Sequence, residues 1–219
     1  MTQNFIIKSV KRPNWICSSV KQNLAILRDA SGSMSDNRKA EDAYKAVCEL
    51  IAELINPSNK DGFYATIIDF AERAEVKHNL QKVSDLQNLL PIVTGGGTSI
   101  TSGLEKAFEI IMKKENLNEE FSFLRPVILL FTDGNHNHGI APHDKATEIK
   151  RDADIVTIAF GNDADEKTLM EIATSPQHFY RCKDGKELRM FLAEVGATLV
   201  ASIDRKSTRL NYSHRIRYR

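Results

Sequence analysis

Apolar positions along the chain form blocks of two kinds, which alternate almost from end to end. Short, nearly continuous apolar runs are typical of parallel strands that other elements cover on both faces. These predicted core strands span residues 23–28, 63–70, 125–132, 154–160 and 178–181. Between and after them, apolar residues recur every three or four positions, as they do on one face of a helix. The predicted helices span residues 36–56, 100–114, 146–151, 165–174 and 184–202.

Three shorter segments complete the prediction. The polar run at residues 75–83 suits an edge strand, and the brief turn before it predicts an antiparallel hairpin. We also expect a short helix at residues 84–90 and a short strand at residues 5–7. The alternation of strands and helices predicts an α/β fold: a doubly wound, Rossmann-like, mostly parallel sheet with one antiparallel edge strand and helices on both faces.

Length and composition suggest one folded domain. The chain has 219 residues, of which 42% are hydrophobic, and this is enough for one sizeable core. Cys17, Cys48 and Cys182 are widely spaced and form no CxxC pair, which argues against a zinc site or a disulfide framework. Without an apolar run of membrane-spanning length or a signal-peptide core, we expect no membrane partner and a cytoplasmic location.

Charge is distributed unevenly along the chain. The full sequence has 30 Lys and Arg against 29 Asp and Glu, and residues 205–219 contain six of the basic residues and no acidic one. Without that segment the net charge is −5, which argues against nucleic-acid binding by the folded body. We therefore divide the chain into an N-terminal extension (1–19), one domain (20–203) and a basic tail (204–219). The tail is expected to be disordered, and it resembles translated ends that are foreign to a native protein.

Oxygen-bearing side chains lie where the predicted strands end. Asp29, Ser31 and Ser33 form a DxSxS turn after the first core strand, and Asp133 directly follows the most apolar strand. Thr98 follows a run of glycines at the entry to a predicted helix. In doubly wound sheets, ligands bind at the carboxyl ends of the strands. Hydroxyl and carboxylate oxygens suit a hard cation such as Mg²⁺, or Mn²⁺.

Together these three pieces resemble the metal-ion-dependent adhesion site (MIDAS) of von Willebrand factor type A (VWA) domains, over roughly residues 20–200. The resemblance implies that Ser31, Ser33 and Thr98 supply hydroxyl oxygens, while Asp29 and Asp133 bind the cation directly or through water. It further implies a protein partner that presents Asp or Glu to the ion. Similar single-domain bacterial proteins act as adaptors beside ATPases, kinases or phosphatases, including tellurium-resistance-type proteins. The expected partner-binding rim consists of Gly97, Ser99, Asn135, His136 and His138.

Two features depart from the usual family pattern. Arg28 takes a position that is usually apolar, and we interpret it as a side chain reaching solvent at the strand end, rather than as a cation that tunes Asp29. The loop after Asp133 is rich in histidine. His136 and His138 could form a metal-ligand pair or contact a partner, but solvated surface histidines are the simpler interpretation.

The sequence matches the motifs of other functions less well. A metal-dependent hydrolase or phosphotransferase could use the same cation, but only His136 and His138 are nearby candidates for a general base. An aspartyl-phosphate mechanism at Asp29 would need a second acid where Ser31 stands. The glycine run 95–97 lacks the P-loop lysine and the third glycine of a dinucleotide site. Nucleic-acid binding through the basic tail is disfavoured by the acidic body.

Overall fold

The computed structural model describes residues 20–55, 62–113, 122–133, 135–161 and 164–217, with side chains up to Ile203. In this part of the chain, seven strands form one sheet with the order β3-β2-β1-β5-β6-β7, and β4 pairs with β1. All neighbouring strands are parallel except β3, which runs antiparallel to β2 at the edge. The strands are β1 (Val20–Asp29), β2 (Phe63–Phe70), β3 (Ala74–Lys82), β4 (Ser122–Phe123), β5 (Val127–Thr132), β6 (Asp154–Phe160) and β7 (Phe179–Cys182).

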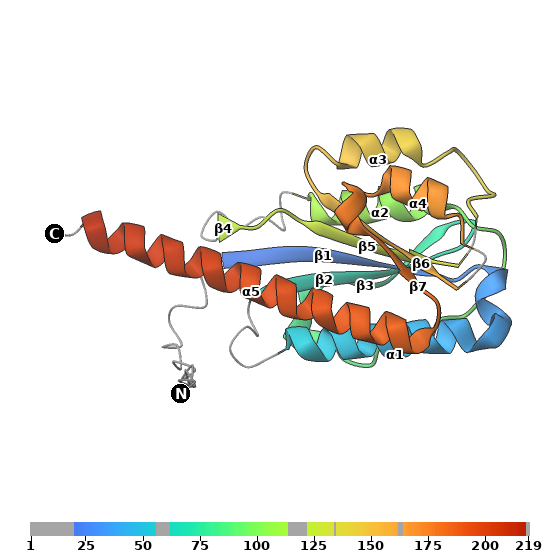
Figure 1. Ribbon diagram of the computed structural model, residues 1–219, viewed down its shortest axis with the longest axis horizontal. Helices are drawn as coiled ribbons and strands as arrows, with labels where there is room; N and C mark the ends of the chain where they lie inside the picture. The colour runs from blue at the N-terminus through green and yellow to red at the C-terminus, as the bar shows by residue number, and fades with distance from the viewer. Residues whose placement is uncertain (1–19, 56–61, 114–121, 134, 162–163, 218–219) are drawn as a thin grey trace, which may run out of the picture.

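Helices cover both faces of the sheet, as Figure 1 shows. One layer contains α1 and α5, which pack against each other, and the other contains α2, α3 and α4. These helices are α1 (Lys39–Leu54), α2 (Ile100–Ile111), α3 (His143–Ile149), α4 (Glu166–Ile172) and α5 (Gly185–Arg217). The predicted doubly wound α/β fold with one antiparallel edge strand is therefore confirmed. The strand expected at residues 5–7 lies outside the described residues.

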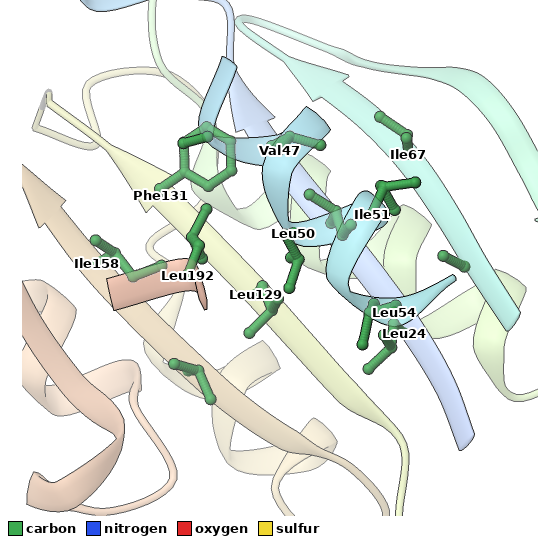
Figure 2. Close-up of a cluster of buried hydrophobic side chains, with 14 of the residues drawn as sticks. Leu24, Val47, Leu50, Ile51, Leu54, Ile67, Leu129, Phe131, Ile158 and Leu192 are labelled. Atoms are coloured by element: carbon green, nitrogen blue, oxygen red, sulfur yellow. The ribbon is translucent and has the colours of Figure 1, made fainter. Parts of the chain in front are cut away.

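Each face of the sheet has its own hydrophobic cluster. Successive residues of a strand point to opposite faces, so Leu24 and Ile26 of β1 join the cluster under α1 and α5, while Ala25 and Leu27 join the other. Figure 2 shows the first cluster, in which Leu50 of α1 lies above the sheet strands together with Leu192 of α5. Because both faces are buried, the strands read as continuous apolar runs in the sequence.

The helix predicted after the DxSxS turn starts later than expected. The helix expected from residue 36 begins at Lys39, after a 3₁₀ segment, η1 (Gly32–Arg38). The backbone is extended at Asp36 and left-handed at Asn37 (φ 51°) and Arg38 (φ 61°), so an α-helix cannot run through these residues.

The short helix expected at 84–90 is limited to the 3₁₀ turn η2 (Val83–Asp85). Farther along, the carbonyl oxygens of Leu89 and Leu90 accept hydrogen bonds from side chains of Tyr44 and Arg28.

The last helix is longer than its apolar pattern suggests. Helix α5 continues to Arg217, through the basic tail that was expected to be disordered, and Figure 1 shows its C-terminal end running past the sheet. No glycine or proline follows Gly196, and extending an existing helix adds a hydrogen bond for each residue that is fixed. Of the helices in the described ranges, none is long and apolar enough to cross a membrane.

Arg28 is completely buried, so the interpretation that it reaches solvent is wrong. Its guanidinium pairs with both carboxylate oxygens of Asp69 on the neighbouring strand β2, at 2.6 and 3.0 Å. A third nitrogen, Nη1, donates to the carbonyl oxygen of Leu90 at 3.0 Å. Burial raises the pKa of Asp69, and the bonds from Arg28 oppose that rise. Arg28 thus ties β1 and β2 to the segment that leads to Thr98.

Arg28→Met should lower the free energy of unfolding by about 3–5 kcal/mol, because it leaves the Asp69 carboxylate buried without its partner. The double variant Arg28→Met/Asp69→Leu should recover most of this loss, since no uncompensated charge then remains inside. Urea denaturation of the two variants and the wild type measures both effects. A single variant within about 1 kcal/mol of the wild type would show that the pair does not constrain the fold.

Candidate metal site

The DxSxS turn and Asp133 lie side by side because their strands are neighbours. β1 and β5 pair in parallel, with Arg28 opposite Phe131, so Asp29 and Thr132 end the two strands at the same level. From β1 the chain crosses through α1 to β2 on one side, and it later returns to β5 on the other. The strand order therefore reverses between β1 and β5, and this is where open α/β sheets bind ligands.

Asp29 is fully buried, and both of its carboxylate oxygens are held. Oδ1 accepts the backbone N–H of Ser31 at 2.7 Å, which closes the DxSxS turn, and Oδ2 accepts the Thr132 hydroxyl. Burial raises the pKa of Asp29; the bonds from Ser31 and Thr132 lower it, and the charge of Asp133 raises it further. A cation beside Asp29 would therefore oppose both of the effects that disfavour its charged form.

Asp133 is also buried, and its contacts reach back to the DxSxS turn. The Ser33 hydroxyl donates to Oδ1 at 2.7 Å, and the Lys39 ammonium lies 2.5 Å from Oδ2. The Ser31 and Ser33 hydroxyls are 3.1 Å apart. Asp29, Ser31, Ser33 and Asp133 are therefore linked in one polar network at the strand ends.

The loop that carries Thr98 is fastened to the DxSxS turn through the backbone. Gly95 N–H donates to the Ala30 carbonyl at 2.8 Å, and Gly32 N–H donates to the Gly96 carbonyl at 3.1 Å. Thr98 itself is buried, and its backbone is held on both sides by Asn137. Asn137 Oδ1 accepts the Thr98 N–H at 2.8 Å, and Asn137 N–H donates to the Thr98 carbonyl at 3.0 Å.

Gly97 is required by this close approach. A Cβ added at Gly97 would lie 2.9 Å from Asn137 Oδ1, the atom that holds Thr98. Gly97 also presents its N–H to Glu72 Oε1 at 3.4 Å. The glycine run thus lets three loops meet at the strand ends.

The donor set fits a hard divalent cation. It consists of two carboxylates and three hydroxyl-bearing residues, which are the oxygen ligands that Mg²⁺ and Mn²⁺ prefer. Across the residues that the structure describes, no group of three or more His, Cys, Asp and Glu could hold a metal ion. A metal site at the strand ends would therefore need the hydroxyls of Ser31, Ser33 and Thr98 as well as the carboxylates.

The five expected rim residues have different roles in the structure. Asn135 and His138 are exposed, and Gly97 is partly exposed beside Thr98. Ser99 is buried, and its hydroxyl caps α2 by accepting the Ser102 N–H at 3.4 Å. It therefore belongs to the support of the site rather than to an accessible rim.

His136 is also part of that support. Its Nδ1 accepts the N–H of Ile100, in the first turn of α2, at 3.2 Å, so this nitrogen carries no proton and is engaged. Its Nε2 is buried and has no hydrogen-bond partner among the described residues. Burial lowers the pKa of His136. A neutral, half-buried ring that holds a helix terminus is poorly suited to act as the general base of a hydrolase.

Sequence reasoning missed three residues that complete the network: Lys39, Thr132 and Asn137. Thr132 could have been found, because it directly precedes Asp133. Once β1 and β5 are paired in parallel, Thr132 lies opposite Asp29. Lys39 and Asn137 had no such signal. Their positions depend on the left-handed turn at Asn37 and on the course of the loop after Asp133.

Comparison with known proteins gives a consistent result. The model of the von Willebrand factor type A domain family matches residues 23–194. Calcium-activated chloride channel regulator 1 of Bos taurus is 29% identical over 177 residues, covering 77% of this chain and 18% of that protein. Complement C2 of Mus musculus is 28% identical over 223 residues, covering 89% of this chain and 29% of that protein. The chain thus spans only a minor part of the length of these relatives.

Solved structures share the fold. Proximal thread matrix protein 1 from the mussel byssus superposes with a TM-score of 0.69 at 22% identity, covering 84% of this chain and 49% of that one. Another structure of the mussel protein, 23% identical with a TM-score of 0.62 and covering 84% of this chain and 46% of that one, is described as having a zinc-occupied MIDAS motif. A von Willebrand factor type A protein from Catenulispora acidiphila superposes with a TM-score of 0.65 at 19% identity, covering 83% of this chain and 43% of that one.

Asn137→Ala should lower the free energy of unfolding by about 1–3 kcal/mol, because the buried N–H of Thr98 loses its acceptor. Asn135→Ala is the matched control, since Asn135 is an exposed residue of the same loop. Chemical denaturation in chelator measures both variants without a contribution from bound metal. Equal losses in the two variants would show that Asn137 does not hold Thr98.

His136 should make the fold less stable in mild acid. Its folded-state pKa lies below the ordinary value of 6.5, so the unfolded chain takes up the proton first as the pH falls. Stability is then lost as the pH falls below about 6.5, until the folded-state pKa is passed. His136→Asn keeps an acceptor for the Ile100 N–H but does not titrate, so its melting temperature in chelator should fall less than that of the wild type between pH 7 and pH 5.

The control for this experiment is His138→Asn, which removes an exposed neighbouring histidine and leaves the Ile100 hydrogen bond in place. It should follow the wild-type profile. If His138→Asn flattened the profile and His136→Asn did not, the assignment to His136 would be wrong.

Proposed function

Because the chain belongs to the von Willebrand factor type A domain family, we propose that it is a metal-dependent protein-binding module. In this proposal the strand-end residues form a MIDAS that holds Mg²⁺ or Mn²⁺ and captures an Asp or Glu side chain of a partner protein. The residues that would hold the ion are Asp29, Ser31, Ser33, Thr98 and Asp133.

The observation that carries the proposal is the contact between distant parts of the sequence at the strand ends. The Ser33 hydroxyl meets Asp133 across 100 positions of the chain. The loop of Thr98 is bonded to the same turn through Gly95 and Gly96. The contacts among these three separate segments support the proposal, because a purely structural capping role for each would not require them to meet.

The composition of the ligand set explains why such a site would bind rather than catalyse. Only two of the five residues are charged, so a bound divalent cation is balanced but not over-neutralised, and it keeps enough Lewis acidity to accept a carboxylate from outside as a further ligand. The hydroxyl of Ser33 and the backbone of Thr98 are held by neighbours, which fixes the ligands without adding charge. His136 is engaged with α2, which weakens the hydrolase alternative.

A cleft beside the DxSxS turn could receive the residues that flank the partner's acid. It has a volume of about 480 Å³ and lies between the start of α1 and the segment at 91–94. Its walls combine apolar side chains such as Met34 and Ile92 with the charged ends of Arg38 and Glu41. A peptide with an apolar residue close to its acidic one would fit these walls.

We further propose a cytoplasmic adaptor role, as in bacterial single-domain relatives of the tellurium-resistance type, without nucleic-acid or membrane partners. Support comes from the net charge of −5 outside the tail and from the free thiols of Cys48 and Cys182. Burial raises the pKa of the Cys182 thiol to about 11, which keeps it protonated and unreactive.

Mg²⁺ or Mn²⁺ should raise the melting temperature, because a ligand that binds only the folded state stabilises it. At 100 times the dissociation constant the gain is about 2.7 kcal/mol, or roughly 5–10 °C for a domain of this size. Asp29→Asn keeps an acceptor for Ser31 N–H but loses the charge, and it should lose most of this shift. Asp85→Asn, at an exposed acid outside the site, should keep it.

The partner is tested by affinity capture with the wild type and with Asp29→Ala/Ser31→Ala, each in Mg²⁺ and in chelator. A protein retained only by the wild type in Mg²⁺ would be the metal-dependent partner. If the wild type shows no shift in melting temperature and retains nothing at millimolar Mg²⁺, the proposal is wrong.

A further inference from the structure

Lys39 makes a buried ion pair inside the candidate metal site. Its ammonium lies 2.5 Å from Asp133 Oδ2, and the two side chains are 11% and 0% exposed. The pairs on the outer surface of α1 are different: Lys45 and Glu41 are 46% and 44% exposed. An exposed pair of that kind contributes little, whereas a buried charge beside a buried carboxylate interacts strongly.

The fold is built to direct Lys39 to this position. The left-handed residues Asn37 and Arg38 turn the chain so that α1 begins with Lys39. Its stem then passes Gly161 at the end of β6. A Cβ at Gly161 would lie 3.3 Å from Lys39 Cε and 3.6 Å from Nζ, and Gly161 has a φ of +89°, which other residues rarely adopt.

From this geometry we propose that Lys39 is a built-in counter-cation that sets the affinity of the site for divalent metal. The inference rests on the proposed function, because it assumes that Asp133 is one of the ligands. Lys39 is a positioning and tuning residue in this scheme, not a ligand.

The electrostatic argument starts from the charges that meet at the strand ends. Asp29 and Asp133 bring two negative charges, and Lys39 neutralises one of them before any ion arrives. A divalent ion bound to Asp133 then shares that carboxylate with an ammonium group of like charge. Each carboxylate oxygen has two lone-pair directions, so Lys39 need not leave Asp133, but the repulsion weakens binding of the ion.

Isothermal titration with Mg²⁺ and with Mn²⁺ tests the proposal on the full chain. Lys39→Met keeps a long apolar stem and removes the charge, and it should bind either ion at least about tenfold more tightly, equivalent to about 1.4 kcal/mol. Lys39→Arg keeps the charge and should bind within about threefold of the wild type. Lys45→Met removes a charge from the same helix outside the site and should bind like the wild type.

Thermal unfolding in chelator supplies a readout that is independent of metal. Lys39→Met should melt below the wild type there, since Asp133 has lost its counter-charge, and saturating Mg²⁺ should stabilise it more than the wild type. If Lys39→Met does not fold, Lys39→Gln takes its place, because its amide can still donate to Asp133.

The possible outcomes separate the two proposals. Metal binding by the wild type with equal or weaker binding by the neutral Lys39 variants would overturn this inference and leave the proposed function intact. Metal binding by the neutral Lys39 variants, with none by the wild type, would support the inference about Lys39. No binding by any variant at millimolar ion would overturn the proposed function, and this inference with it.

Discussion

Two carboxylates buried at the ends of adjacent strands are the constraint around which this end of the molecule is organised. Asp29 and Asp133 lie on the two strands where the sheet reverses its order, and both are almost completely removed from solvent. A buried carboxylate is costly unless its oxygens are satisfied. The surrounding elements supply donors to all four oxygens: a backbone N–H and the hydroxyl of Thr132 for Asp29, a hydroxyl and the Lys39 ammonium for Asp133.

The loop of Thr98 depends on a second buried charge, which belongs to the core rather than to the site. Arg28 holds Asp69 and the Leu90 carbonyl, and Tyr44 of α1 donates to the Leu89 carbonyl. The segment before the glycine run is not helical, and its carbonyl oxygens accept these side-chain hydrogen bonds instead of helical ones. The bonds fix the course of this segment. Beyond it, Asn137 closes on Thr98 from the other side. The backbone of Thr98 is thus held in place by contacts that come from β1, α1 and the loop after β5.

The fold could be predicted from sequence because it depends on patterns that are local and repeated. Strands that are buried on both faces are continuously apolar, and helices have an apolar residue every three or four positions. The architecture could therefore be predicted from the order of these two kinds of segment along the chain. The proposed ligands Asp29 and Asp133 were also visible, because they lie at the ends of predicted strands. Arg28 was misjudged because burial of an arginine depends on a partner, Asp69, that is 41 positions away. Lys39 was missed, and His136 was placed on the rim, for a related reason: their contacts are set by loop conformations, which apolar periodicity does not encode.

Lys39 changes the net charge that a partner would meet at the ion-loaded site. With Asp29 and Asp133 alone, a divalent ion would neutralise the site, and an incoming carboxylate would meet no net charge. With Lys39 also present, the ion-loaded site carries one positive charge, and a single Asp or Glu from outside makes it neutral. In the proposed scheme, the same ammonium that would weaken metal binding would therefore strengthen the attraction for an acidic partner. Such an arrangement would couple the two ligands: the ion would be held best when the partner's carboxylate is present, and the carboxylate would bind weakly without the ion.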